Sequence, residues 1–299
     1  MKVVLGTRGS RLALAQSEWV ATQVRARGAE VEVRVLRTTG DVQAGPLSQT
    51  GYGVFVRELE QALLSGDISL AVHSLKDLPT GPRPGLMIAA VPPREDPRDA
   101  LIARVGLKDL PAGSRVGTGS ARRIAQLRAV RPDLEYLPLR GNVDTRLRKL
   151  DAGEYDALIL ACAGLSRLGL AERITERLSP DVCLPAPGQG ALALQVREND
   201  AEMRALLAPL DDTPTRLAVT AERAFLERLA GGCMVPVGAL GQAESGRLML
   251  RGVVADLGGE VRFVGEEAGS RNAPEVVGRA LAARLLKRGA DRVLEASRC

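Results

Sequence analysis

The chain has 299 residues, of which 45% are hydrophobic and 26% charged, the balance of an ordinary soluble globular protein. Its net charge is only +5 and few residues are aromatic, which argues against a protein that stacks single-stranded nucleic acid on aromatic rings. No stretch approaches the roughly 18 consecutive apolar residues of a membrane-spanning helix, and residues 1–6 lack the apolar run of a signal peptide. We therefore expect a cytoplasmic protein of two or three domains.

Nearly all of the positive charge is arginine, because only five of the 41 basic residues are lysines. Arginine binds carboxylates and phosphates with a planar, two-pronged fork. The same bias also arises from genome composition or from adaptation to heat, so it does not identify a ligand by itself. A modest positive excess permits nucleic-acid binding without requiring it.

The first ~90 residues alternate strand and helix patterns at the spacing of βα units. The predicted strands are residues 2–5, 31–36, 68–72 and 87–91, and the predicted helices are residues 12–24 and 55–64. A proline cluster at residues 92–97 then breaks the pattern and marks the first predicted boundary.

A second α/β unit follows this boundary. Its predicted strands are residues 100–103, 115–117, 135–137 and 157–161, and its predicted helices are residues 124–130 and 143–150. After a second break at residues 185–190, the strand at 191–196 is too short to be a domain, so we expect it to return to an earlier sheet. A helix is expected to begin at Thr213-Pro214, and three strands and a helix over 275–287 complete a small α+β domain.

The predicted fold class is therefore α/β, with two α/β lobes and a small C-terminal α+β domain. We expect three domains: residues 1–93 plus about 190–210, residues 94–189, and residues 211–299.

Four segments share Gly or Ser with Arg and follow a predicted strand, where each is expected to open a helix: residues 6–11, 117–123, 139–146 and 163–167. Free N–H groups at a helix N-terminus, a hydroxyl and a guanidinium together form an anion site. Such segments at the strand ends of open sheets predict a ligand with several negative charges. The alternative is a set of ordinary turns with solvated arginines. None of the four is a P-loop.

A predicted buried strand leads into His73, Lys76 and Asp77, and Pro79 fixes the loop that follows. A carboxylate there could stabilise a developing cation or move a proton. The alternative is a Lys–Asp pair at the surface, with His73 as a core residue. The residues alone leave both interpretations open.

The four cysteines are far apart in the sequence: Cys162, Cys183, Cys233 and Cys299. There is no C-x-x-C pair, and one histidine cannot complete a Cys/His zinc site or supply the base of a Ser-His-Asp or Cys-His arrangement. We expect free thiols, with Cys162 in the core.

Cys233 stands out because it lies on a Gly-Gly turn between a predicted helix and a predicted strand. The helix ends just before it, and the negative end of a helix dipole disfavours a thiolate. A loop residue is therefore the simpler interpretation on chemistry alone, and a nucleophile is the alternative.

Taken together, these motifs resemble the porphobilinogen deaminase (hydroxymethylbilane synthase) family over nearly the whole chain. Six motifs carry the resemblance in family order: residues 7–10, 72–79, 94–99, 139–143, 184–190 and 231–233. Two positions depart from the family pattern. Tyr52 stands where lysine is common, and Gly119-Ser120-Ala121 replaces a run that has a second serine.

The resemblance implies a transferase of heme and porphyrin biosynthesis. Such an enzyme joins four porphobilinogen molecules head to tail, releases ammonia and gives the linear tetrapyrrole hydroxymethylbilane. The resemblance also implies lobes like those of periplasmic binding proteins. It implies a dipyrromethane cofactor, made from substrate, in thioether linkage to Cys233.

The resemblance further implies Asp77 as the catalytic residue. The cofactor-binding residues it implies besides Cys233 are Lys76, Ser120, Arg122, Arg123 and Arg146, and the substrate-binding residues are Arg8, Ser10, Arg140 and Arg167. We expect a monomer that binds no metal, nucleic acid or membrane. The alternative function is a non-catalytic, two-lobed binding protein for a small polycarboxylate, which has no need of the Gly-Gly-Cys motif.

Overall fold

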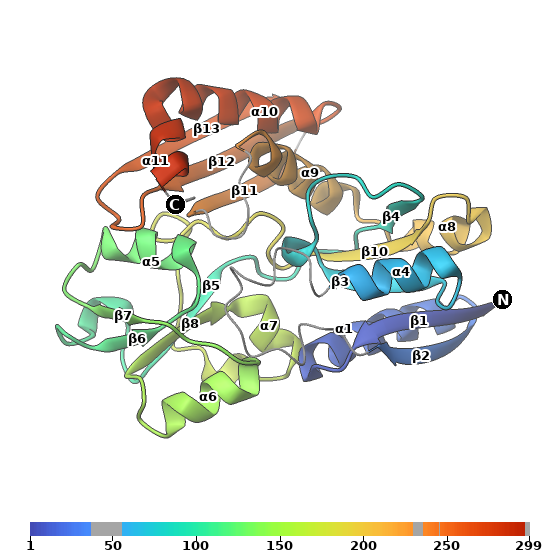
Figure 1. Cartoon of the computed structure of the whole chain (residues 1–299), viewed down its shortest axis with the longest axis horizontal. Coiled ribbons are helices and arrows are strands. Elements are labelled where there is room, and N and C mark those ends of the chain that lie inside the picture. Colours follow the sequence, from blue (N-terminus) through green and yellow to red (C-terminus); the bar gives the residue numbers. More distant parts are fainter. Residues whose placement is uncertain (37–55, 230–235, 245, 297–299) are drawn as a thin grey trace. The chain divides into compact units, whose positions relative to one another are not determined.

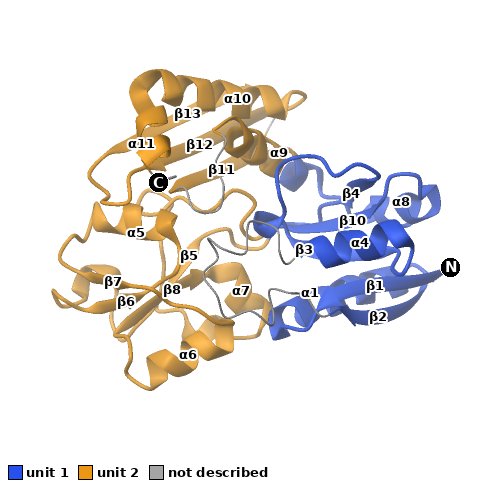
Figure 2. Ribbon diagram, viewed as in Figure 1, with its two compact units in different colours: residues 1–94, 191–216 blue, residues 95–190, 217–299 orange. Residues whose placement is uncertain are grey.

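The structure is a computed structural model that describes residues 1–36, 56–229, 236–244 and 246–296. The chain forms two compact units, one of residues 1–94 and 191–216 and the other of residues 95–190 and 217–299 (Figure 2). Each unit combines sheets with helices, which confirms the predicted α/β class (Figure 1). The finer division into three domains stays a prediction.

The first unit is built on a five-stranded sheet in the order β2-β1-β3-β10-β4. β1 runs parallel to β2 and β3, whereas β10 runs antiparallel to β3 and β4. The strands are β1 (Lys2–Arg8), β2 (Glu30–Leu36), β3 (Leu70–Ser74), β4 (Leu86–Ala90) and β10 (Leu192–Arg197). The position of β10 confirms that this late strand returns to an earlier sheet.

Helices cover this sheet because each of them carries an apolar stripe. Val20 and Val24 of α1 are completely buried in one cluster with Val3 and Leu5 of β1. The helices of the unit are α1 (Arg11–Arg25), α4 (Arg57–Ser65) and α8 (Ala201–Leu207), with short 3₁₀ turns η1 (Leu75–Asp77) and η4 (Ala208–Leu210).

The second unit contains a five-stranded sheet in the order β7-β6-β8-β5-β9. β6 is parallel to β7 and β8, and β5 is antiparallel to its neighbours β8 and β9, so the first four strands repeat the pattern of the first sheet. The strands are β5 (Asp99–Ile102), β6 (Arg115–Gly117), β7 (Glu135–Leu137), β8 (Ala157–Ala161) and β9 (Glu176–Arg177). Its helices are α5 (Ala121–Arg128), α6 (Val143–Asp151) and α7 (Cys162–Arg167), with 3₁₀ turns η2 (Leu107–Asp109) and η3 (Ala171–Arg173).

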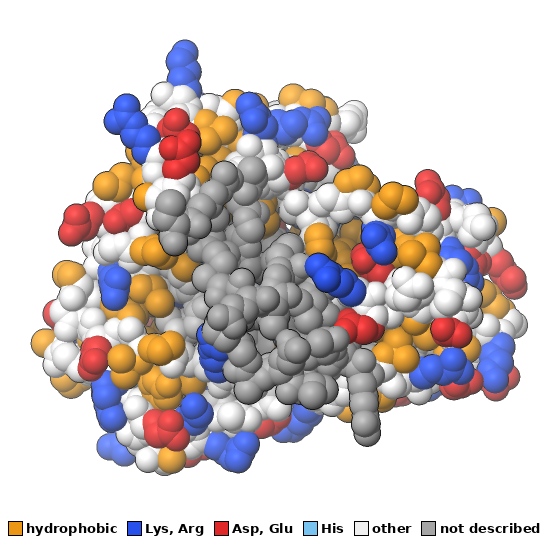
Figure 3. Space-filling view, viewed as in Figure 1, with side chains coloured by type: hydrophobic (Ala, Val, Ile, Leu, Met, Phe, Trp, Pro, Cys, Tyr) orange, Lys and Arg blue, Asp and Glu red, His pale blue; other side chains and the backbone are white. Residues whose placement is uncertain are grey.

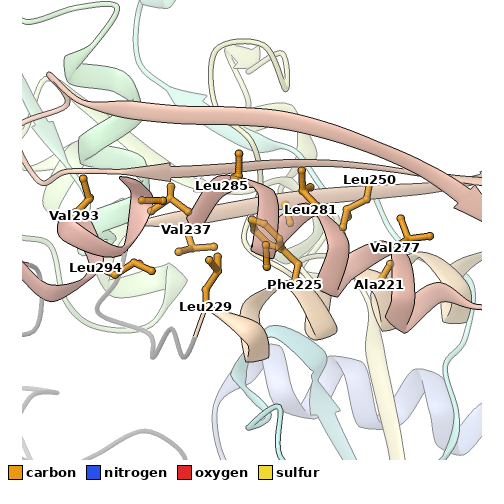
Figure 4. Packing of buried hydrophobic residues seen from close by; sticks show 14 of the residues in the cluster. Ala221, Phe225, Leu229, Val237, Leu250, Val277, Leu281, Leu285, Val293 and Leu294 are labelled. Carbon is orange, nitrogen blue, oxygen red and sulfur yellow. The ribbon is translucent and has the colours of Figure 1, made fainter. Parts of the chain in front are cut away.

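The C-terminal part of the second unit has its own core. Figure 4 shows Phe225 packed with Leu281 and Leu285, and all three side chains are completely buried. A side chain at Gly252 would meet the Phe225 ring at 2.7 Å, so the ring needs glycine there. The elements are α9 (Thr213–Arg228), the antiparallel strands β11 (Val237–Glu244), β12 (Arg247–Ala255) and β13 (Arg262–Ser270), α10 (Pro274–Leu285), the π-helical turn η5 (Leu286–Ala290) and α11 (Asp291–Ala296).

The sequence predictions agree with the structure to within three residues for every predicted strand and helix whose ends are described. One prediction was wrong: residues 163–167 do not form a loop that opens a helix, because they lie inside α7. The elements α7, α8, α11 and β9 were not predicted, since each is too short to show an apolar period. None of the helices in the described ranges has the length and apolarity needed to cross a membrane.

Candidate active site

The first group of predicted site residues lies at the carboxyl edge of the sheet in the first unit. Arg8 is the last residue of β1, and Ser10 caps α1 because its Oγ accepts a hydrogen bond from the Ala13 N–H at 3.3 Å. β3 runs parallel beside β1, so the turn after β3 emerges at the same edge. That turn carries Lys76 and Asp77.

A hydrogen bond fixes the helix after β1 to the end of β3. The Gln16 side chain of α1 is buried and donates from Nε2 to Ser74 Oγ at 3.1 Å. Beyond this contact the Lys76 side chain is half-buried and Asp77 is exposed. The turn η1 therefore holds an exposed carboxylate next to the end of a buried strand.

His73 is not part of this polar edge. It is buried in β3, and its Nε2 lies 2.9 Å from Gln195 Oε1. Burial lowers the pKa of His73 to about 4, so the imidazole is neutral near pH 7. The interpretation of His73 as a core residue is confirmed.

The second group lies at the carboxyl edge of the parallel strands in the second unit. Ser120 follows β6 and caps α5 by accepting a hydrogen bond from the Arg123 N–H at 3.5 Å. Asn142 follows β7 and caps α6 in the same way, accepting from the Thr145 N–H at 2.9 Å. Arg140 precedes this cap and has an exposed side chain.

Arg122 and Arg123 converge on one buried carboxylate. Arg122 donates from NH1 to Asp99 Oδ2 at 2.6 Å, and Arg123 donates from NH2 to Asp99 Oδ1 at 2.7 Å. Burial alone would raise the pKa of Asp99, but the two guanidinium groups outweigh it and hold that pKa well below its ordinary range. Asp99 is therefore ionised at any physiological pH.

Arg146 and Arg167 are cations of a different kind. Within the described ranges, neither forms an ion pair; each donates instead to a carbonyl, Arg146 Nε to Gly141 O at 2.8 Å and Arg167 NH2 to Gly190 O at 2.6 Å. Burial lowers the pKa of both, and the positive charge of Arg123 lowers that of Arg146 further. These two side chains are suited to a negatively charged ligand.

One face of the molecule carries charges of both signs. On the face shown in Figure 3, Lys and Arg side chains are interspersed with Asp and Glu side chains over both units.

Sequence reasoning assigned no role to Asp99, although it closes the motif at residues 94–99. Its role depends on a contact 23 residues along the chain, with Arg122, which no local pattern signals. Gln189 was missed in the same way; it donates from Nε2 to Asp99 Oδ1 at 2.9 Å. Cys233 and Tyr52 lie outside the described residues.

Comparison with known proteins decides the family. Residues 3–205 match the family model described as "Porphobilinogen deaminase, dipyromethane cofactor binding domain", and residues 216–287 match the model "Porphobilinogen deaminase, C-terminal domain". The chain belongs to the porphobilinogen deaminase family. It is accordingly a transferase of tetrapyrrole biosynthesis with a dipyrromethane cofactor.

Curated relatives in the porphobilinogen deaminase family extend over nearly the whole chain. The chain is 55% identical to the porphobilinogen deaminase of Desulforudis audaxviator, with 98% of this chain and 97% of that protein covered. It is 52% identical to the porphobilinogen deaminase of Acidothermus cellulolyticus, with 98% of this chain and 91% of that protein covered. The alternative of a non-catalytic binding protein finds no support in these relatives.

Two solved structures show a looser likeness. The methionine binding protein MetQ has a TM-score of 0.43 and 14% identity, with 70% of this chain and 89% of that chain covered. Lipoprotein Tp32 from Treponema pallidum has a TM-score of 0.45 and 16% identity, with 70% of this chain and 90% of that chain covered.

Proposed function

We propose that this protein joins four porphobilinogen molecules head to tail and releases four ammonia molecules, giving the linear tetrapyrrole hydroxymethylbilane. The observation that carries the proposal is the pair Arg146 and Arg167, half-buried cations that form no ion pair within the described residues. Partly buried charge without a partner is unfavourable, and an anionic ligand relieves that cost. Each porphobilinogen carries an acetate and a propionate, so a growing chain gains two carboxylates per step.

The donor set fits the dipyrromethane cofactor, because forked guanidinium groups bind carboxylates in two-pronged fashion. We assign the cofactor to Lys76, Ser120, Arg122, Arg123 and Arg146, and the substrate to Arg8, Ser10, Arg140 and Arg167. When bound, the cofactor supplies the pyrrole ring from which the chain is extended.

We assign the catalytic role to Asp77. Its exposed carboxylate sits on the turn η1, whose approach is fixed by the buried strand β3 and the Gln16–Ser74 hydrogen bond. A fixed negative charge stabilises the positive charge that develops on the substrate pyrrole as ammonia leaves. An Asp77 carboxylate oxygen can also accept the proton that the pyrrole carbon loses when the new bond forms.

We assign the covalent attachment to Cys233, in the Gly-Gly-Cys motif. Cys162 and Cys183 are free thiols in the interior, and burial raises the pKa of each to about 12. A thiolate is the reactive form of cysteine, so neither buried thiol is a competent nucleophile near pH 7. This argument supports a thiol on a glycine turn as the attachment point.

The intact mass of the purified protein tests the proposal. We expect a mass excess equal to two linked pyrrole units in the wild type and in a Cys299→Ser control, and no excess in Cys233→Ser. A fully active wild type without added mass would overturn the assignment. The cytoplasmic location and the monomeric state stay predictions.

A further inference from the structure

Asp99 lies at the centre of a buried network in the second unit. It is the first residue of β5, it is completely buried, and its two oxygens accept from five donors. The donors are Arg122 NH1, Arg123 Nε and NH2, Gln189 Nε2 and the Cys183 thiol, at 2.6, 3.0, 2.7, 2.9 and 3.4 Å. Such complete satisfaction allows a carboxylate to stay ionised in the interior.

The network fixes which N–H groups of the arginines remain available. NH1 of Arg122 donates to Asp99 and to Leu184 O at 2.7 Å, whereas its Nε and NH2 have no acceptor in the part of the chain that the structure describes. Arg123 donates from NH1 to Ile159 O at 2.9 Å and from both Nε and NH2 to Asp99. Within the described residues, Arg122 is therefore anchored through NH1 alone, whereas all three guanidinium nitrogens of Arg123 donate to protein acceptors.

The same carboxylate sets the charge of the cluster. Asp99 offsets one of the two charges on Arg122 and Arg123, and its presence raises the pKa of Arg122 although burial lowers it. Arg146 lies close enough to Arg123 for the two positive charges to repel each other. Without Asp99, the two guanidinium groups would lose the acceptor that holds them in place, and Arg123 would still be repelled by Arg146.

We propose that Asp99 is a positioning residue for the cofactor site: it orients the guanidinium groups of Arg122 and Arg123 and halves their net charge, so that the pair accepts the cofactor carboxylates in one fixed geometry. This inference rests on the proposed function, which assigns Arg122 and Arg123 to the dipyrromethane. Asp99 acts through the arginines and does not touch the cofactor.

The test separates cofactor loading from folding. Asp99→Asn keeps the shape of the side chain and removes its charge, and Asp99→Glu keeps the charge and moves it by one methylene. Asp156→Asn is the matched control, because Asp156 also forms a two-pronged ion pair, with Arg115, but at the exposed surface. Each variant is made with Cys233 intact and in a Cys233→Ser background that cannot carry the cofactor.

Intact mass gives the fraction of folded protein that carries two pyrrole units, and thermal unfolding of the Cys233→Ser forms gives stability without the cofactor. We expect Asp99→Asn to lower the loaded fraction about tenfold, the effect of losing a charge-assisted hydrogen bond, while Asp156→Asn stays fully loaded. We expect Asp99→Glu to load to an intermediate degree.

Full loading of folded Asp99→Asn would overturn the inference, even if its melting temperature fell, since that is the result of a purely structural role. Should Asp99→Asn fail to fold, Asp99→Glu decides in its place: reduced loading with a preserved melting temperature supports the inference, and full loading contradicts it. A wild type without the added mass would instead contradict the proposed function itself.

Discussion

The imidazole of His73 donates a hydrogen bond to the side-chain oxygen of Gln195 at 2.9 Å, between the neighbouring strands β3 and β10. The Gln195 amide in turn donates to Glu60 Oε1 at 3.2 Å, which fixes the orientation of the amide and requires the proton of the neutral imidazole to be on Nε2. The histidine thus joins two strands that are distant in sequence. The contacts of His73 in the first unit therefore favour the neutral imidazole.

We predict that this histidine makes stability depend on pH. Its pKa is about 4 in the folded protein and about 6.5 in the unfolded chain, so the unfolded chain binds the proton first as the pH falls. Stability is therefore present above about pH 6.5 and declines toward pH 4, by about 3 kcal/mol over the interval. Urea unfolding from pH 7 to pH 4 measures this slope.

The matched variant is His73→Gln, which keeps a hydrogen-bonding side chain but cannot titrate. The carboxylates of the chain contribute equally to both proteins, so the difference between the two curves isolates the histidine. We expect the curves to converge as the pH falls. Parallel curves from pH 7 to pH 4 would show that His73 does not govern the acid sensitivity.

A second prediction concerns Asp77→Asn. The side chain is exposed on η1, so we expect an unchanged melting temperature and a loss of most turnover, because the amide carries no negative charge for the developing cation. Steady-state kinetics and thermal unfolding measure the two effects. The control is Asp67→Asn, an exposed carboxylate that hydrogen-bonds Ser65 at 2.6 Å in the same unit. Near-normal turnover in Asp77→Asn would remove its catalytic role.

Local patterns predicted most of this fold, since β1, β3 and β8 contain apolar runs and α1 and α6 show helical spacing and capping residues. The capping roles of Ser10, Ser120 and Asn142 are local as well, because each accepts from a residue three positions ahead. Side-chain contacts between residues that are distant in the sequence could not be predicted in this way. No local pattern predicts that Asp99 pairs with Arg122 and Arg123, or that Gln195 forms a hydrogen bond with His73. Both contacts depend on which strands lie side by side, β8 next to β5 and β3 next to β10.

A third prediction concerns the left-handed backbone at Gly190. Its φ is +88°, and a side chain there would collide with the backbone carbonyl of Glu95, while its own carbonyl accepts from Arg167. The control is Gly153→Ala, with φ +75° and no heavy atom within 4 Å of the added methyl. We expect Gly153→Ala to lose about 1 kcal/mol from backbone strain alone and Gly190→Ala to lose clearly more. Equal losses in urea unfolding would show that the Glu95 contact yields without strain.

A fourth prediction concerns the buried thiols. Because Cys162 and Cys183 are completely buried and burial raises the pKa of each to about 12, we expect neither to react with iodoacetamide in the native protein near pH 7. Both should react after denaturation, which serves as the positive control. Peptide mass mapping distinguishes the sites. Rapid alkylation of either cysteine in the native protein would contradict the burial of its side chain.

The last prediction concerns Arg146, the cation that is repelled by Arg123 and has no ion-pair partner among the residues described. Removing its charge relieves this repulsion but also removes the hydrogen bond to Gly141 O. In the Cys233→Ser background we therefore expect Arg146→Gln to change the unfolding free energy by no more than about 1 kcal/mol. With Cys233 intact, the loaded fraction or the turnover should fall about tenfold or more, because a charge-assisted contact to a carboxylate is lost.

Arg148→Gln is the matched control for Arg146, since Arg148 lies on the same helix and has an exposed side chain. Among the described residues, that side chain donates a hydrogen bond only to Thr145 Oγ1, at 3.1 Å. We expect this control to load and turn over normally. A large loss of stability in Arg146→Gln together with normal loading would mean that Arg146 supports α6 and does not bind the ligand. Normal stability together with reduced loading would instead show that the Arg146 charge contributes to binding the cofactor carboxylates and not to folding.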